Sequence, residues 1–223
     1  MPQNPDKTQT EIPYSVLEYT ANFKKPILEA WTVPVKLITA VLSALDPFGF
    51  KLDGVESNTR TEKLSEYSLL FRRNPPGVTF SVRLGKLVVV ADNLDWTEAG
   101  QFITAMDTGV KALLAAAGAE IQSHYVALSM HIQPKVKRLN EITAPLSNSV
   151  ALKLLDGEVK FQGIILRGEK SHIVIDESVA YANGLFVRIG RGHPPGATLQ
   201  QMADVLHGDE ERLFDVLGLE GDL

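Results

Sequence analysis

The sequence contains no cysteine, and this absence excludes a whole set of chemistries. Disulfide bonds, thiolate nucleophiles and zinc or iron–sulfur sites held by cysteine cannot occur in the chain. Charge is also modest, because 22 lysines and arginines stand against 27 aspartates and glutamates, for a formal net charge of −5. That balance argues against wholesale binding to a nucleic-acid backbone, which depends on clustered cations that release counterions.

Long hydrophobic runs are also missing. No stretch approaches the roughly 20 apolar residues that a helix needs to cross a bilayer. The first eleven residues, MPQNPDKTQTE, are polar and have no apolar region of the kind found in secretion signals. The sequence therefore predicts a cytoplasmic protein without membrane association. Its 223 residues, 44% of them hydrophobic, suit a globular chain with a large core.

The first half of the chain predicts alternating strands and helices. Tyr14–Phe23 is rich in β-branched and aromatic residues, as strands are. A short helix is expected over Val35–Asp46, because apolar residues recur there at helical spacing. Two paired strands are then expected over Tyr67–Arg73 and Val78–Leu84. The continuous apolar run Leu87–Asp92 predicts an interior strand.

The clearest helix is expected from Asp95 to about Ala117. Asp95 and Glu98 have the spacing of a capping box, and Gly118 stands where a left-handed residue ends a helix. Apolar residues at steps of three and four form one stripe: Trp96, Ala99, Ile103, Met106, Val110, Leu113 and Ala117. Such a stripe packs against a sheet or forms a coiled-coil seam, and the flanking strands favour the sheet.

A further strand over Glu120–Pro134 completes the order strand, helix, two or three strands, helix, strand. This order predicts a ferredoxin-like βαββαβ unit with an additional hairpin. Three turn signals then separate apolar runs: Asp156-Gly157, Gly168-Glu169-Lys170 and Asn183-Gly184. Asp-Gly and Asn-Gly suit two-residue hairpins, so an antiparallel meander of four strands is expected. Two short helices, or one helix bent at His207-Gly208, follow at the end.

The predicted fold class is therefore α+β, a ferredoxin-like unit followed by an antiparallel β-meander and C-terminal helices. Four regions are expected: a flexible segment 1–11, the ferredoxin-like unit 12–134, a connector 135–149, and the meander with its helices over 150–223. The two β units are either one continuous domain or two. Exposed edges of the meander invite pairing with a second chain, which predicts a homodimer.

The chief candidate site is the segment FVRIGRGHPPGATLQQMADVL, which starts at Phe186. Its arginines and histidine precede a predicted helix N-terminus, where backbone N–H groups and the helix dipole favour an anion. Thr198 and Gln201 also have capping-box spacing, so the helix can satisfy its own N-terminus. The segment is thus either a solvated turn or an anion-binding loop. Four residues are the candidates for binding: Arg188, Arg191, His193 and Thr198.

The string Pro-Pro-Gly occurs twice, at Pro75–Gly77 and Pro194–Gly196. Proline and glycine supply the backbone angles of tight turns, which explains both copies without a ligand. Because a strand follows the first copy and a helix follows the second, the repeated string does not indicate a duplicated domain. No P-loop or dinucleotide fingerprint accompanies either copy.

The five histidines have none of the spacings typical of metal sites, so no metal and no cofactor are predicted. His124 and His131 are seven residues apart on one expected strand and should point to opposite faces. No motif joins a nucleophile to a base. The sequence therefore predicts a non-catalytic binding or interaction protein, with a protein partner or a second copy as its ligand. The alternative is an enzyme or small-molecule binder acting on an anion at the 188–198 loop.

Three stretches resemble one family: KKPILEA at Lys24, SHIVIDES at Ser171 and ADVLHGDEERLFDVL at Ala203. The family consists of sporadically distributed bacterial proteins of unknown function. Its members begin with a Pro-Pro-Ile-x-Glu-Ala-type segment and close with a Leu-His segment followed by a phenylalanine. The resemblance spans most of the chain and implies no known activity, so no catalytic residue is carried over from it.

Overall fold

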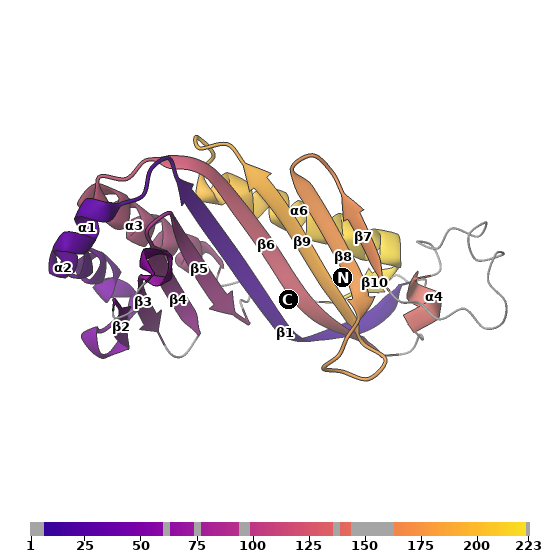
Figure 1. Ribbon diagram of the computed structural model, residues 1–223. Coiled ribbons are helices and arrows are strands. Elements are labelled where there is room, and N and C mark those ends of the chain that lie inside the picture. The colour runs from indigo at the N-terminus through magenta and orange to yellow at the C-terminus, as the bar shows by residue number, and fades with distance from the viewer. Residues whose placement is uncertain are drawn as a thin grey trace. The chain divides into compact units, whose positions relative to one another are not determined.

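The computed structural model describes residues 7–59, 63–73, 77–93, 99–135, 139–143 and 163–221. Over these residues the chain is a mixed α/β protein with a largely antiparallel sheet (Figure 1). The chain divides into two compact units. Unit 1 comprises residues 1–15, 128–191 and 204–223, and unit 2 comprises residues 16–127 and 192–203.

Unit 2 holds most of the first half of the chain. Its elements are α1 (Leu28–Thr32), α2 (Pro34–Leu45), η1 (Asp46–Phe48), η2 (Leu52–Gly54), β2 (Val55–Asn58), η3 (Leu64–Glu66), β3 (Ser68–Arg73), β4 (Val78–Arg83), β5 (Lys86–Asp92) and α3 (Ala99–Ala117). Parts of β1 (Thr8–Phe23) and β6 (Ile121–Pro134) and the start of α6 (Leu199–Leu217) complete it. The strand order is β2-β3-β4-β5-β1-β6.

Most described residues of the predicted α3 stripe are core, while Ile103 and Ala117 are half-buried. Met106, Val110 and Leu113 are all buried. Gly118 ends the helix with φ 59°, as its position predicts. The predicted capping box at Asp95 lies outside the described residues. Strand alternation also holds in β4, whose buried and half-buried residues alternate.

Unit 1 holds the other halves of β1 and β6 and most of the second half of the chain. Its further elements are α4 (Leu139–Thr143), β7 (Ile164–Arg167), β8 (Ser171–Glu177), β9 (Leu185–His193), most of α6, and β10 (Leu219–Glu220). The strand order is β1-β6-β9-β8-β7, and β10 pairs in parallel with β1. The first predicted strands of the meander, including Asp156-Gly157, lie outside the described residues.

Three elements of unit 1 refine the sequence predictions. The strand expected from Tyr14 begins at Thr8, because Thr8 and Gln9 pair with β10, near the far end of the sequence. Of the two alternatives predicted for the C-terminal helices, the structure has the single helix, α6, which continues through Gly208. The two-residue turn expected at Asn183-Gly184 is part of a longer loop, Ser178–Gly184. Asn183 still adopts a positive φ of 57° within that loop.

The order of elements repeats along the chain. With α1, β2 and the short 3-10 helices left aside, the order β1, α2, β3, β4, β5, α3 is matched among the described elements by β6, α4, β7, β8, β9, α6. The strand order repeats as well, as β3-β4-β5-β1 and as β7-β8-β9-β6. Helices α3 and α6 each span 19 residues. Each is followed by a glycine in the left-handed region, Gly118 at φ 59° and Gly218 at φ 62°.

Within the part of the chain that the structure describes, no helix is both long enough and apolar enough to cross a bilayer.

Candidate functional site

One face of the unit 1 sheet carries no described helix. Successive side chains of β9 point to opposite faces of the sheet. Arg191 contacts Asp209 on α6, so Arg191 lies on the helix side. Phe186 and Arg188 are an odd number of residues away from Arg191 and therefore lie on the face without a helix. Figure 1 shows α6 behind β8 and β9 and no helix in front of them. We call this surface the open face. Its residues are Tyr14, Ser129, His131, Gln133, Ile165, Arg167, His172, Val174, Asp176, Phe186 and Arg188.

Aromatic rings gather at one end of the open face. The ring centroid of His131 lies 6.2 Å from that of Tyr14, 5.5 Å from that of Tyr181 and 5.3 Å from that of Phe186. We call these four residues the aromatic cluster. Tyr14 is 37% exposed, and the other three are half-buried. The cluster therefore presents aromatic surface to solvent while its rings pack on one another.

A hydrogen-bonded loop holds this cluster in place. Ser178 Oγ accepts the backbone N–H groups of Ala180 at 3.2 Å and Tyr181 at 3.0 Å. A hydroxyl oxygen has two lone pairs and one hydrogen, so its hydrogen is directed to His131 Nδ1, 2.8 Å away. Ser178 is 7% exposed. Its oxygen closes the loop, so the Ser178–His131 bond links this loop to β6, and we call Ser178 the clamp of the aromatic cluster.

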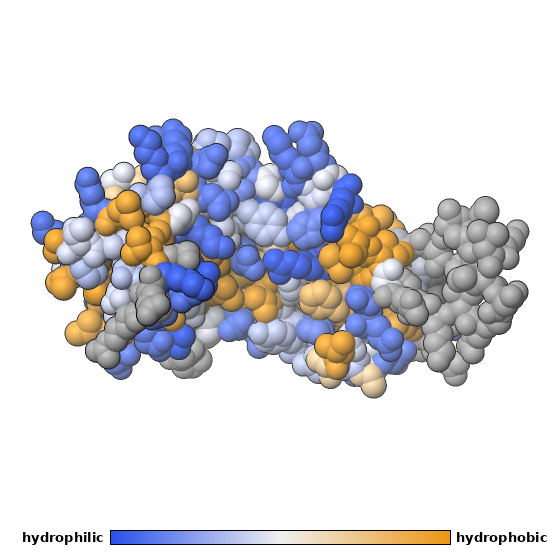
Figure 2. Space-filling model, viewed as in Figure 1, coloured by the Kyte–Doolittle hydropathy of each residue, from blue (hydrophilic) through white to orange (hydrophobic). Residues whose placement is uncertain are grey.

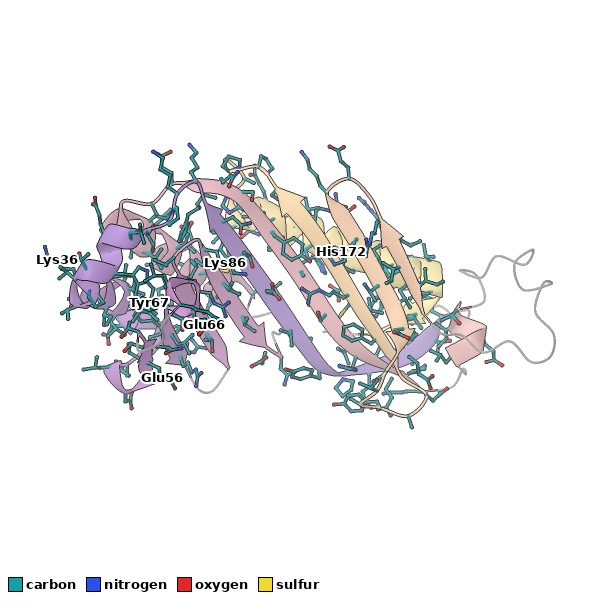
Figure 3. All side chains as sticks on the ribbon, in the orientation of Figure 1. Lys36, Glu56, Glu66, Tyr67, Lys86 and His172 are labelled. Carbon is teal, nitrogen blue, oxygen red and sulfur yellow. The ribbon has the colours of Figure 1, made fainter. Side chains whose placement is uncertain are left out.

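Charged and apolar residues continue the open face beyond the cluster. Arg188 donates from Nη1 to Ser129 Oγ at 2.8 Å, which orients its guanidinium along the face. His172 lies on β8 (Figure 3), where it faces Gly190 across the strand pair. Ile165 on β7 is 60% exposed. Figure 2 shows hydrophobic surface where Figure 1 places β7, and hydrophilic surface beside it.

The structure does not bring the two arginines of the predicted anion loop together. Arg188 lies on the open face, whereas Arg191 lies on the helix side and pairs with Asp209. Arg191 Nε and Nη2 each donate to an oxygen of Asp209 at 2.8 Å. His193 ends β9 and belongs to unit 2, as does Thr198. The anion site stays a prediction, and any anion at Arg191 has to compete with a bidentate carboxylate.

Thr198 forms the helix N-terminal capping box that its spacing from Gln201 predicts. Its Oγ1 accepts the backbone N–H of Gln201 at 3.2 Å, and Gln201 Oε1 accepts the backbone N–H of Thr198 at 3.0 Å. This is the reciprocal capping box, and it satisfies two donors at the start of α6 from within the chain.

Arg191→Ala is expected to lower the free energy of unfolding by about 1–2 kcal/mol. The carboxylate of Asp209, whose side chain is 12% exposed, would lose its bidentate partner, and the ion pair with Arg212 at 3.7 Å would be the one left to it among the described residues. Urea denaturation measures the loss. The double variant Arg191→Ala/Asp209→Asn should recover part of it, because no uncompensated charge remains. Equal stability of wild type and Arg191→Ala would contradict a structural ion pair and would favour the anion loop.

The Pro-Pro-Gly turn before α6 is held by a buried histidine of unit 2. His124 Nε2 donates to the carbonyl oxygen of Pro195 at 3.1 Å, and its Nδ1 lies 2.9 Å from the hydroxyl of Tyr19. Burial raises the pKa of Tyr19 well above its usual value, and the charge of Asp107 adds to this effect. Tyr19 therefore stays protonated and donates to His124. His124 is buried and His131 is half-buried, which agrees with the prediction that the two side chains point to opposite sides of their strand.

Unit 2 contains a cavity of about 540 Å³ next to the end of α3. It is lined by the segments 24–29 and 117–120. The first of these is most of the KKPILEA stretch that carries the family resemblance. Lys24 Nζ lies 2.6 Å from a carboxylate oxygen of Glu120, and this hydrogen bond lowers the pKa of Glu120. Two of the charged residues that line the cavity, Lys24 and Glu120, are thus paired with each other. Elsewhere too, the described residues include no group of three His, Asp or Glu side chains suited to a metal ion.

The chain has distant similarities to solved structures. No family model matches the chain, and no curated protein matches it. Among solved structures, Methanococcus jannaschii TBP is similar with 14% identity and a TM-score of 0.31, over 94% of this chain and 98% of that one. The class II 3-hydroxy-3-methylglutaryl-CoA reductase from Streptococcus pneumoniae is similar with 10% identity and a TM-score of 0.23, over 95% of this chain and 62% of that one. These scores do not establish a common fold.

The sequence did not single out the aromatic cluster. The sequence places Tyr14 and Phe186 in strands. It also indicates that His131 points to the opposite face of its strand from His124. Their convergence, however, depends on β1, β6 and β9 being successive neighbours in the sheet. A single sequence gives no direct signal of that order.

Proposed function

We propose that the chain is a cytoplasmic, non-catalytic binding protein that takes a protein partner on the open face of unit 1. The aromatic cluster carries the proposal. Its rings are half-exposed, lie on a face that no described helix covers, and are fixed by the Ser178 clamp. Aromatic and arginine side chains held rigidly in this way are typical of the residues that dominate protein interfaces. Rigid rings lose little conformational entropy when a partner binds.

A catalytic role has less support from the same residues. Ser178 is buried and its hydroxyl closes a loop, and Arg191 is already paired with Asp209. The alternative of an enzyme or small-molecule binder acting on an anion at the 188–198 loop would need one of these contacts to open. Binding at the open face needs neither change.

Selection from a phage-displayed peptide library on the full chain tests the proposal. Peptides that bind are expected to lose at least about tenfold in affinity for Phe186→Ala, because truncating an aromatic interface residue removes more than about 1.4 kcal/mol. Val90→Ala is the matched control, since Val90 is a half-buried residue on β5 of unit 2. No enrichment, or binding that Phe186→Ala leaves unchanged, would refute the proposal.

A second copy of the chain is the other protein partner that the sequence predicts. Sedimentation of the same wild-type and Phe186→Ala samples separates the two cases. A dimer that dissociates in the variant would identify the second copy as the occupant of the open face. A monomer at all micromolar concentrations would leave a different protein as the partner.

The finer description of unit 2 is also a proposal. We infer a ferredoxin-like core from the order β4-β5-β1-β6, with α2 following β1 and α3 following β5. Strands β2 and β3 then extend this core at one edge.

A further inference from the structure

We infer that His131 is a proton-operated switch, whose protonation loosens the Ser178–Gly184 loop and so weakens the binding of a partner at the aromatic cluster. The effect on binding rests on the proposed function, whereas the effect on the loop does not. Both effects start from the hydroxyl of Ser178, which serves three hydrogen-bonding groups: the imidazole of His131 and the backbone N–H groups of Ala180 and Tyr181.

The hydrogen bonds at Ser178 fix the protonation state of His131. A hydroxyl oxygen has two lone pairs, and here they accept the backbone N–H groups of Ala180 and Tyr181. The hydroxyl hydrogen is what remains for His131, so Nδ1, which lies 2.8 Å away, accepts it. Nδ1 can accept only in the neutral imidazole, whose own hydrogen is then on Nε2. The closed loop therefore requires neutral His131.

Protonation reverses the direction of the hydrogen bond at Nδ1. An imidazolium carries a hydrogen on both ring nitrogens, so Nδ1 becomes a donor that faces an oxygen without a spare lone pair. The rings of Tyr14, Tyr181 and Phe186 hold the imidazolium in place, because aromatic faces attract cations. To accept from Nδ1, Ser178 Oγ has to release one N–H of the loop. The bond from Ala180, at 3.2 Å, is longer than the bond from Tyr181, at 3.0 Å, so Ala180 is released first.

The loop carries this change to the aromatic cluster. The backbone N–H of Tyr181 is bound to Ser178, and its ring centroid lies 5.5 Å from that of His131. Two backbone bonds of the loop do not use the hydroxyl: Ser178 donates to Gly184 at 2.8 Å, and Gly184 donates to Tyr181 at 3.1 Å. Protonation therefore loosens the loop without unfolding it. Closure is complete while His131 is neutral and is lost as the pH falls.

The pH window separates His131 from the other titratable groups around it. Histidine ordinarily changes charge between about pH 5 and pH 8, whereas carboxylates, tyrosines, lysines and arginines ordinarily titrate outside that range. Tyr14 and Tyr181 contact the imidazole itself. The described charged residues of the surrounding elements are Glu11 on β1, Lys135 directly after β6, Glu141 on α4, Asp176 and Glu177 on β8, Arg188 on β9 and Glu220 on β10. His172 on β8 is also a histidine of the open face, so it needs a control of its own.

Amide exchange measured by NMR on the isotope-labelled full chain tests the switch without any ligand. The exchange rates of Ala180 and Tyr181 are compared at about pH 7.5 and about pH 5.5, on either side of the ordinary histidine titration, and corrected for the intrinsic pH dependence of exchange. The Ala180 amide is expected to lose about tenfold in protection at the lower pH, the effect of one lost hydrogen bond.

Three variants assign the response to its residues. His131→Asn keeps an acceptor beside Ser178 and cannot be protonated, so its Ala180 amide should be equally protected at both pH values. Ser178→Ala removes the clamp, so its loop should be unprotected at both. His172→Asn is the matched control and should keep the wild-type response. Thermal melting of each variant confirms that it is folded.

A peptide selected by phage display and labelled with tetramethylrhodamine, whose fluorescence is insensitive to pH, measures the effect on binding. The wild type is expected to bind it about fivefold to tenfold more weakly at the lower pH, because Tyr181 loses its fixed position. His131→Asn should remove this difference, and any dependence left in that variant belongs to the peptide.

Two results would overturn the switch: equal protection of Ala180 at both pH values in the wild type, or a loss of protection that His131→Asn retains. A loop that responds to pH while wild type and His131→Asn show the same pH dependence of peptide affinity would overturn the effect on binding. The proposed function fails separately, if no peptide is enriched or if Phe186→Ala leaves binding unchanged, and the exchange measurement still decides the switch.

Discussion

Met106→Asp is expected to leave the protein unfolded or insoluble. Met106 is 3% exposed at the centre of the α3 stripe. An unpaired carboxylate in that position must be desolvated or protonated. The variant also loses the apolar contacts of Met106. We therefore expect the free energy of unfolding to fall by more than about 4 kcal/mol, a large share of the stability of an ordinary domain.

Circular dichroism and the soluble fraction after expression measure this effect. Gln101→Asp is the matched control, because Gln101 is exposed near the start of the same helix and its change should stay within about 0.5 kcal/mol. A soluble Met106→Asp protein that melts near the wild-type temperature would show that the stripe is not core.

Gly109→Val should be the second most damaging change, with a loss of about 3 kcal/mol. A β-carbon on Gly109 would lie 2.8 Å from Phe80 Cε1 and 2.9 Å from Leu45 Cδ2. Both neighbours are buried, so neither can move away freely. Gly109 thus allows α3 to pack closely on α2 and on β4, and the added methyl groups of valine would force them apart.

Alanine substitutions at two helical glycines provide the control. A β-carbon on Gly208, inside α6, meets nothing within 4 Å. Gly208→Ala should therefore stabilise the protein by about 0.5–1 kcal/mol through helix propensity alone. Gly109→Ala gains the same propensity but meets Phe80, so it should destabilise. Urea denaturation measures both changes, and the same sign for the two variants would contradict the packing argument.

The sequence predicts those parts of the fold whose signal is local. The α3 stripe repeats every three or four residues, and the alternation of β4 repeats every two, so each is readable within one element. The parallel strand β10 has no such signal, because Leu219 and Glu220 become a strand only through pairing with Thr8 and Gln9. For the same reason the start of β1 was not predicted.

In the candidate site, too, contacts between residues close in the sequence were predictable and contacts set by strand order were not. Thr198 and Gln201 lie three residues apart, and their capping box follows from that spacing. The aromatic cluster, in contrast, joins residues from β1, β6, β9 and the Ser178–Gly184 loop, whose proximity is set by strand order. The pairing of Arg191 with Asp209 is intermediate: both residues are visible in the sequence, but their contact requires α6 to lie across the helix side of β9.

The repeated order of elements was also invisible in the sequence. The two Pro-Pro-Gly strings drew attention to a repeat, yet they occupy different places, one before β4 and one before α6. The similarity between the two halves lies in strand order and helix length, which many different side chains can satisfy. Pattern matching between short strings cannot detect it.

The interleaving of the two units has a consequence for synthesis on the ribosome. Residues 16–127 form nearly all of unit 2 and emerge as one continuous stretch, so this unit can begin to fold while translation continues. The first half of β1 emerges earlier but belongs to unit 1, where it neighbours β6 and, at Thr8 and Gln9, pairs with β10. Thr8–Ser15 must therefore wait as an unpaired strand until β6 has been made, and Thr8 and Gln9 meet β10 only after α6. The polar residues Thr8, Gln9, Thr10 and Glu11 at its start would help to keep that waiting strand from pairing with other chains.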